Sequence, residues 1–495
     1  MDKNLHVTFN SMDKKVLPKA YYPGGQLTSY TVGVARNATD GCQFSVLSRE
    51  GERKNLKIEV VGDLGKGVNI EVLREGYVSC EGALYPDPVY VDDCTFDLEE
   101  FKNVTYLINV STTAETVPGN YDFKVALYEN GELYNEYNLW VRVWNFTMDS
   151  TKYMDTTMGI DTNWLFLQHK TDDREGVFKK YYDTLLNRYH ICGRFLPYDI
   201  LDPRADEYMS DPRVTTFHVP YYSSFQKEYS DADDKVLAYY NKLKTNPEWL
   251  KKAMFYVVDE PQRMDDYERI RTVCEKLSKI FPEYKLVIPY YMDPRDGEGK
   301  RAVELMEDYN IVWCPKSSLF REDWLKGYMA SRREKGDRTW WYCCWEPPLP
   351  YANLFIDMEG FYHRVLFWQQ YLYDVKGFLY WQTTHWNNGS PWDVTSTVPE
   401  LSYYCFGDGS LLYNGDRIGV DGPVGSYRLE LVRSAIEDYQ MFQLAEQAFG
   451  REYVEEQLHK ITKNIREYCD DHRLLAKMRM EIGNKLSDYY TELGA

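Results

Sequence analysis

Residues 253–270 read "AMFYVVDEPQRMDDYERI", an aromatic and β-branched run that stops at Asp259-Glu260-Pro261 and passes into apolar residues at helical spacing. A continuous apolar run of this kind is typical of a strand in a parallel sheet, where helices cover both faces. The stretch therefore predicts one strand–helix unit with two neighbouring acids at the carboxyl end of its strand.

Similar runs recur on both sides of this unit and are separated by amphipathic stretches. They span residues 156–161, 191–198, 216–222, 285–291, 310–316, 339–346 and 377–382. Eight strand–helix units at a spacing of roughly 30 residues match a (β/α)8 TIM barrel, whose active site lies at the carboxyl ends of the strands. We predict that residues 149–424 form such a catalytic barrel.

The flanking regions have different patterns. Residues 1–148 contain short alternating segments between Gly, Asn, Asp and Pro clusters, and Asn130-Gly131 indicates a tight hairpin. We expect these residues to form an N-terminal β-sandwich. Residues 425–495 keep apolar side chains at helical spacing, which predicts a C-terminal helical segment packed on the barrel.

Composition excludes several function classes. The net charge of -19 argues against binding to nucleic acid or to an anionic membrane surface. The sequence has no apolar run of about 18 residues and starts without a signal peptide, so we expect a cytoplasmic protein, or an exported one whose signal has been trimmed. The ten cysteines are scattered and no CxxC, HExxH, GxGxxG or P-loop motif is present, so we expect neither a metal nor a nucleotide cofactor. The oligomeric state stays open.

The predicted strand ends are rich in carboxylates and aromatic rings. They carry Asp161, Tyr198, Tyr222, Asp259, Glu260, Tyr290, Asp293, Lys316, Glu346, Trp381 and His385. The sequence lacks a GxSxG nucleophile elbow, whereas acids beside aromatic platforms are typical of glycoside chemistry. This pattern indicates a carbohydrate or glycan as the substrate.

The neighbouring acids Asp259 and Glu260 do not suit a conventional pair. Two retaining carboxylates stand about 5–5.5 Å apart across the scissile bond, whereas adjacent strand residues are anchored at almost the same place. The two acids can instead take separate roles in substrate-assisted hydrolysis. Glu260, with a pKa raised by burial, would protonate the leaving group, and Asp259 would orient a 2-acetamido group whose carbonyl oxygen attacks the anomeric carbon.

Five stretches resemble glycoside hydrolase family 123: "YTVGVARNATDGCQFSVLS" (30–48), "YVVDEP" (256–261), "NLFIDMEGFYHRVLFWQQYLYDVKGFLYWQ" (353–382), "GDGSLLYNG" (407–415) and "SYRLELVRSAIEDYQ" (426–440). The resemblance implies a β-sandwich followed by a TIM barrel, and an exo-acting, retaining β-N-acetylgalactosaminidase that needs no metal or organic cofactor. It also implies that Asp259 orients the acetamide and that Glu260 is the acid/base. The barrel-end aromatic residues Trp345, Tyr380 and Trp381 become candidates for the sugar pocket. The strand-end residues Tyr198, Tyr290, Glu346 and His385 are further candidates for contact with the substrate.

Two alternatives stay open. Glu260 and Glu346, at the predicted fourth and seventh strand ends, would form the acid/base and nucleophile of a conventional retaining β-glycosidase. In that large superfamily the strand-four motif usually reads Asn-Glu-Pro, and Asp259 replaces the Asn. The other alternative is a non-catalytic carbohydrate-binding protein, which would keep the aromatic residues without needing both acids.

Overall fold

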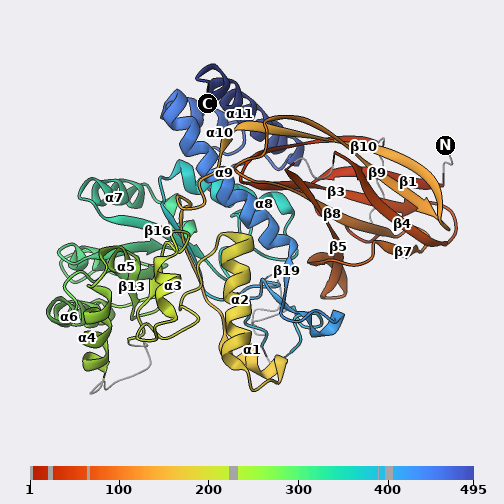
Figure 1. Cartoon of the computed structure of the whole chain (residues 1–495). Coiled ribbons are helices and arrows are strands. Elements are labelled where there is room, and N and C mark those ends of the chain that lie inside the picture. Colours follow the sequence, from red (N-terminus) through yellow and green to blue (C-terminus); the bar gives the residue numbers. More distant parts are fainter. Residues whose placement is uncertain are drawn as a thin grey trace.

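The computed structural model describes residues 4–19, 26–63, 67–221, 232–387, 389–395 and 405–494, so the predicted strand-end residue Tyr222 lies outside it. An N-terminal β-rich region stands beside an α/β region, and the C-terminal helices lie where the two regions meet (Figure 1). The chain is therefore multidomain in architecture, with β and α/β parts.

The β-rich region contains two sheets that share one apolar core. The first runs β1 (Leu5–Ser11), β3 (Thr39–Ser48), β8 (Asn103–Thr112), β5 (Val68–Cys80), β6 (Ala83–Tyr90), β19 (Pro423–Ser426) and β18 (Tyr413–Asn414). The second runs β2 (Ser29–Arg36), β10 (Glu132–Thr147), β9 (Gly119–Glu129), β4 (Arg53–Gly62) and β7 (Thr95–Leu98). Phe44 of the first sheet packs edge-on against Tyr137 of the second, with ring centroids 5.4 Å apart.

The predicted hairpin at Asn130-Gly131 is confirmed. Strands β9 and β10 pair antiparallel from Glu129 and Glu132 outward. Asn130 and Gly131 have φ values of 51° and 82°, and the two-residue turns whose twist matches that of a hairpin require positive φ at both positions.

The α/β region is built on a third, parallel sheet. Its order is β11 (Asp155–Met158), β17 (Gly377–Tyr380), β16 (Arg338–Cys343), β15 (Ile311–Pro315), β14 (Leu286–Tyr290), β13 (Ala253–Tyr256) and β12 (Phe217–His218). Seven of the eight predicted strands are therefore present, and the sheet is barrel-like.

The prediction of a strand at residues 191–198 is wrong. Its backbone makes a single bridge, from Gly193 to Met158, and Pro197 has no N–H to donate to a longer ladder. The main chain around Gly193 nevertheless connects the two edge strands. Arg194 N–H donates to Met158 of β11 at 2.8 Å, and His218 N–H of β12 donates to Arg194 at 2.7 Å.

Helices cover this sheet and fill the junction with the β-rich region. They are α1 (Thr162–His169), α2 (Arg174–Tyr189), α3 (Ala205–Ser210), α4 (Ala232–Leu243), α5 (Pro247–Lys252), α6 (Met264–Ile280), α7 (Asp323–Glu334), α8 (Gly360–Leu372), α9 (Tyr427–Phe449), α10 (Arg451–Leu458) and α11 (His472–Glu492), with short 3-10 turns at Ala302–Met306, Ser317–Arg321 and Gly415–Ile418.

A buried carboxylate ties three of these helices together. Asp438 of α9 accepts from Arg364 of α8 and from Arg479 of α11, each at 2.7 Å. Trp144 of β10 donates its indole N–H to Asn484 of α11, so the last helix packs on the β-rich region as well. The C-terminal helices thereby hold the two regions in one arrangement.

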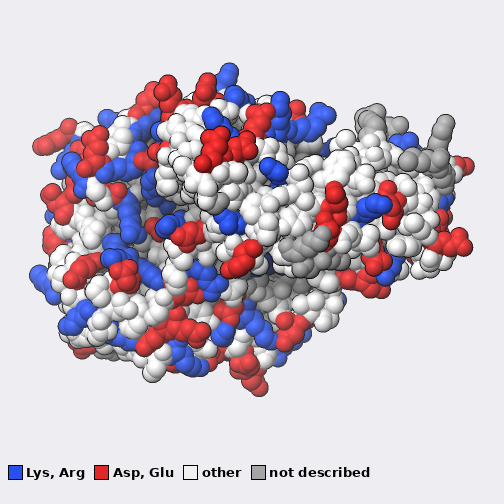
Figure 2. Space-filling model, turned by 45° about the horizontal axis from the view of Figure 1, so that its top comes forward, with Lys and Arg blue, Asp and Glu red and all other residues white. Residues whose placement is uncertain are grey.

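On the face of the molecule that Figure 2 draws, neither charge forms a dominant patch among the described residues. Figure 2 shows acidic and basic side chains interspersed over the face in view. Among the residues that the structure describes, no helix has the length and apolar character needed to cross a bilayer, and the cysteines form no disulfide.

Candidate active site

A cavity of about 270 Å³ lies at the carboxyl ends of β13, β14, β16 and β17. Two acids and several aromatic and small side chains line it: Tyr256, Asp259, Glu260, Pro289, Tyr342, Cys344, Trp345, Leu379 and Trp381. Apolar residues of the same strands, Met254, Val287 and Trp340, are buried in the cluster that these side chains continue. Since chemistry in barrel enzymes takes place at this end of the strands, the cavity is the candidate active site.

Asp259 and Glu260 both line this cavity although they are neighbours in the chain. Strand β13 ends at Tyr256, so neither acid belongs to the pleated ladder that would send adjacent side chains to opposite faces. Glu260 has a φ of 45°, a left-handed conformation that is uncommon outside glycine and turns the chain sharply. Such an outlier at a cavity is typical of functional sites.

The two acids do not serve as the cap of the helix that follows. Helix α6 begins at Met264, and the carboxylate of Asp266 accepts the main-chain N–H groups of Gln262 and Arg263 at 3.0 Å. Because Asp266 already caps this helix, helix capping does not explain the Asp259-Glu260 pair.

A separate tyrosine holds each acid. Tyr256 donates its hydroxyl to Asp259 Oδ1 at 2.6 Å, and Tyr342 donates to Glu260 Oε1. Burial raises the pKa of both tyrosines well above the usual value, so both hydroxyls keep their protons and act as donors near neutral pH. The Arg194 guanidinium lies over the Tyr256 ring, 4.7 Å from its centroid.

The environment of Glu260 favours its protonated form. Burial raises the pKa of this carboxyl above its ordinary value, and the neighbouring charges of Asp259 and Glu346 raise it further. The Tyr342 hydrogen bond and the Lys316 charge act in the opposite direction. The net upward shift suits a group that delivers a proton to a leaving oxygen.

Glu346 lies beside this pair but does not line the cavity. Its carboxylate is paired with the ammonium of Lys316, a residue that is only 6% exposed. The same ammonium lies 4.7 Å from the ring centroid of Tyr291. Lys316 thus stands where its charge acts on both Glu260 and Glu346.

Trp345 and Trp381 form aromatic parts of the wall. Trp345 is 38% exposed, and Trp381 donates its indole N–H to the carboxylate of Asp408. His385 packs against Trp381 with ring centroids 4.8 Å apart, and its Nδ1 lies 3.0 Å from Asp161 Oδ2. His385 therefore packs against Trp381 without lining the cavity itself.

Four of the nine predicted site residues, Asp259, Glu260, Trp345 and Trp381, meet at the cavity. Tyr290 and Tyr380 belong to the core cluster on the other side of the sheet. Tyr198 packs under Arg204, whose guanidinium lies 4.1 Å from the ring centroid, and it does not line the cavity. Glu346 and His385 take the neighbouring positions described above.

The lining residues Tyr256, Pro289, Tyr342, Cys344 and Leu379 are absent from the sequence-based site. Strand-end position alone does not single them out, because it ignores which face each residue occupies. The period of two along a strand is the signal that finds them. Along β16 and the residue that follows it, Trp340, Tyr342 and Cys344 form one series that faces the cavity, whereas Trp341 and Cys343 belong to the core on the other side.

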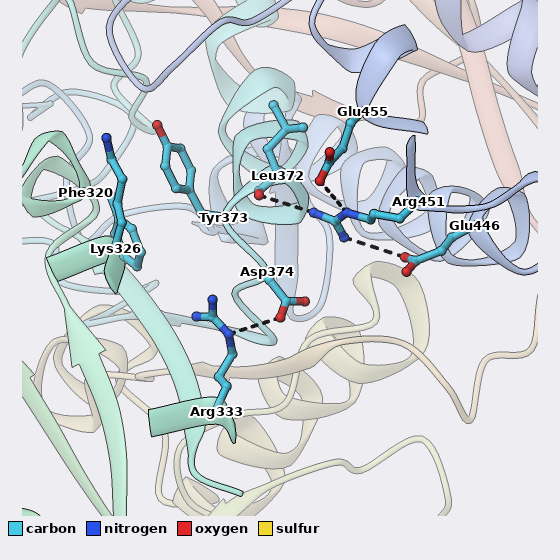
Figure 3. A pocket seen from close by; sticks show the side chains of 9 residues that line it. All are labelled: Phe320, Lys326, Arg333, Leu372, Tyr373, Asp374, Glu446, Arg451 and Glu455. Atoms are coloured by element: carbon cyan, nitrogen blue, oxygen red, sulfur yellow. Dashed lines mark hydrogen bonds and ion pairs between the residues drawn. The ribbon is translucent and has the colours of Figure 1, made fainter. Parts of the chain in front are cut away.

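A larger cavity of about 460 Å³ lies among α7, α8, α9 and α10, near the residues that precede β17 (Figure 3). Its charged side chains largely pair with one another. Arg333 contacts Asp374 at 3.1 Å, and Arg451 contacts Glu455 at 2.7 Å. Its acids do not lie at the carboxyl ends of the parallel strands, where barrel enzymes carry their catalytic groups, so this cavity is not the candidate active site. In the described part of the chain, no group of three or more His, Cys, Asp or Glu residues is arranged to hold a metal ion.

Similarity to known proteins identifies the family of this chain. The family description "Glycoside hydrolase 123, catalytic domain" matches residues 177–445, which is more than half of the chain. Among solved structures, the fold is similar to a family 123 glycoside hydrolase from Clostridium perfringens that was analysed for glycolipid glycan hydrolysis, with a TM-score of 0.72, 14% identity and 99% coverage of both chains. The match to a family 39 glycoside hydrolase from Bacteroides cellulosilyticus WH2 covers 82% of this chain and 81% of that chain at 10% identity. Its TM-score of 0.33 is too low to indicate a shared fold. No curated protein matches the sequence. The family match includes the segment with Asp259 and Glu260, and the chain belongs to glycoside hydrolase family 123.

Proposed function

We propose that this glycoside hydrolase is an exo-acting, retaining enzyme that removes a terminal β-linked N-acetylhexosamine, N-acetylgalactosamine in the first instance, by substrate-assisted catalysis. The observation that carries the proposal is the pair of neighbouring acids in one cavity, each held by its own tyrosine. The glycolipid glycan hydrolysis described for the Clostridium perfringens enzyme is consistent with an amino sugar at a glycan end.

The first step breaks the glycosidic bond. The carbonyl oxygen of the 2-acetamido group attacks the anomeric carbon, while Glu260 gives its proton to the departing oxygen. Asp259 accepts the acetamide N–H and stabilises the positive charge of the bicyclic oxazolinium ion that forms. The Tyr256 hydroxyl keeps the Asp259 carboxylate aimed at that position.

The second step restores the enzyme. Glu260, now a carboxylate, takes a proton from water as the water oxygen attacks the anomeric carbon from the side that the leaving group vacated. The carbon–oxygen bond of the oxazolinium breaks, and the sugar leaves with its original anomeric configuration. Glu260 ends the cycle protonated, in line with the burial that raises its pKa.

The cavity volume supports action on a chain end. At about 270 Å³ it lies just below the usual range of ligand pockets, which is roughly 300–1,000 Å³. A single sugar ring suits this volume better than an extended stretch of glycan. We further propose that residues around Gly193 take the eighth strand position and complete a (β/α)8 arrangement, because they connect β11 to β12.

The test compares aryl β-glycosides of GalNAc, GlcNAc, galactose and glucose, with product anomers followed by NMR. We expect turnover of acetamido sugars only, and a rate that falls as fluorine atoms on the acetyl group weaken its carbonyl nucleophile. Asp259→Asn and Glu260→Gln should abolish turnover. Asp374→Asn, which alters a paired carboxylate at the other cavity, is the matched control and should retain full activity.

The position of Glu346 supports a second mechanism, which the same test distinguishes from the first. Glu346 stands close enough to Glu260 to influence its pKa, so a conventional acid/base and nucleophile pair has a structural basis. That mechanism predicts hydrolysis of plain hexosides, no dependence on acetyl fluorination, and complete loss of activity in Glu346→Gln. Those results together would replace substrate assistance with the conventional scheme.

A further inference from the structure

Asp408 connects the wall of the candidate active site to the rest of the fold. It is fully buried, and its carboxylate accepts the indole N–H of Trp381 at 3.0 and 3.1 Å and the hydroxyl of Tyr380 at 3.0 Å. Trp381 lines the cavity, whereas Tyr380 belongs to the core on the other side of the sheet. One carboxylate therefore holds both faces of the end of β17.

The loop that carries Asp408 is fitted closely to Trp381. Gly407 and Gly409 have φ values of 74° and 69°, which favour glycine, and a Cβ on Gly409 would lie 2.4 Å from the Trp381 ring. Gly409 N–H also donates to the Tyr380 hydroxyl at 3.1 Å. The two glycines thus let the loop backbone approach the indole closely enough for Asp408 to reach it.

Arg428 of α9 holds this loop from the opposite side. It is fully buried and donates to the carbonyl oxygens of Gly407, Ser410 and Leu354. Its remaining donors form a two-point bond with Asp87 of β6, with both distances at 2.8 Å. A continuous set of buried hydrogen bonds therefore runs from the β-rich region through Arg428 and the loop to Trp381.

We propose that Asp408 is a positioning residue that sets the orientation of Trp381 and so shapes the sugar-binding wall, and that Arg428 and Asp87 hold Asp408 in place. The proposal rests on the cavity being the active site, and it deepens the proposed function by naming what defines its wall. Asp408 acts through Trp381 and takes no part in the bond changes.

The chemistry of the contact explains why a carboxylate is suited to this position. An ionised carboxylate only accepts hydrogen bonds, and both the indole and the phenol act as donors here. An amide in its place presents one oxygen and one NH2 group. Because the indole N–H of Trp381 reaches both carboxylate oxygens, the NH2 group would face that donor in either orientation. We expect Asp408→Asn to release Trp381 while preserving side-chain volume.

The first test observes Trp381 directly in protein labelled with 5-fluorotryptophan, by fluorine NMR. The Trp381→Phe variant identifies its signal. We expect Asp408→Asn to shift or broaden that signal. Asp337→Asn is the matched control, because Asp337 accepts the indole N–H of Trp313 at 2.7 Å outside the cavity, and it should leave the Trp381 signal unchanged. An unmoved Trp381 signal in Asp408→Asn would overturn the proposal.

A titration of the wild type covers the case in which Asp408→Asn does not fold. Burial raises the pKa of Asp408 to about 6, so the Trp381 signal should change as pH falls through that value. The titratable and charged groups facing Asp408 are Tyr380, Arg428, His385, Cys343, Cys344 and Cys405. Of these, His385 packs against the Trp381 ring, so the titration is repeated in His385→Gln. Loss of the transition in that variant would assign it to His385 and count against Asp408.

Kinetics provide the functional readout. With any glycoside that the enzyme hydrolyses, Asp408→Asn should raise KM about 10-fold and leave kcat nearly unchanged, because a wall contact is made in both ground and transition states. Its effect should add little to that of Trp381→Phe, since both variants remove the same contact. Additive effects would show that Asp408 acts elsewhere. If no acetamido sugar is hydrolysed, the proposed function fails, whereas the NMR result still decides the role of Asp408.

Discussion

Replacing Tyr256 with Phe removes the hydroxyl oxygen that donates to Asp259 Oδ1 at 2.6 Å. The ring stays, and with it the packing under Arg194 and the wall of the cavity. In the proposed mechanism Asp259 must be aimed at the acetamide N–H when the oxazolinium charge develops. The substitution therefore tests orientation of that carboxylate separately from its presence.

The expected magnitude follows from the kind of bond that is lost. A hydrogen bond to a charged group contributes about 1.5–3 kcal/mol, and each 1.36 kcal/mol of transition-state stabilisation is a factor of ten in rate. We expect kcat/KM for an aryl β-GalNAc substrate to fall about 10- to 150-fold, mainly through kcat.

Initial rates over a range of substrate concentrations measure this loss. Tyr290→Phe is the matched control, because the Tyr290 hydroxyl is buried in the core behind the sheet and has no hydrogen-bond partner in the described part of the chain. It should keep wild-type kinetics. A Tyr256→Phe enzyme whose kcat/KM stays within about threefold of wild type would refute the assigned role of this hydrogen bond.

Three further outcomes are expected. Tyr342→Phe removes a bond that lowers the pKa of Glu260, so the basic limb of the pH–rate profile should move to higher pH; a shift to lower pH would contradict the acid role. Burial raises the pKa of Glu75 to about 8, so the contribution of this group to the free energy of unfolding is present at low pH and is lost as pH rises through that value. The free energy of unfolding of Glu75→Gln should therefore rise by up to about 5 kcal/mol relative to wild type between pH 4 and 9, seen as a growing difference in Tm. Arg428→Met leaves the Asp87 carboxylate buried without its cation, and should lower the free energy of unfolding by about 3–5 kcal/mol in denaturant melts, whereas an unchanged melt would show that this pair adds little.

Local sequence patterns predict part of the candidate active site. The acids at 259 and 260 were predictable because they end an apolar run, and strand ends in a barrel gather at one edge. The face that each aromatic residue occupies was harder to predict. Tyr290 and Tyr380 stand at strand ends like Trp381, yet they pack behind the sheet, since a shift of one residue reverses the side on which a strand residue points.

Residues far apart in the chain account for the rest of the site. Nothing local to residue 408 indicates that it binds Trp381, and the Arg428–Asp87 bond joins positions separated by 341 residues. The short strands β18 and β19 pair through β6 with the N-terminal sheet, although they follow the α/β region in sequence.

The sequence by itself determined the succession of strands and helices, the Asn130-Gly131 hairpin and the position of the two acids. Backbone preferences and the period of apolar residues are local properties, and they are readable in a short window. Only the tertiary structure decided that the 191–198 segment makes one bridge, that Glu260 turns into the same cavity as Asp259, and that two tyrosines hold these acids. Those features depend on which distant groups meet once the chain is packed, because burial and hydrogen-bond partners are set by contacts across the whole fold.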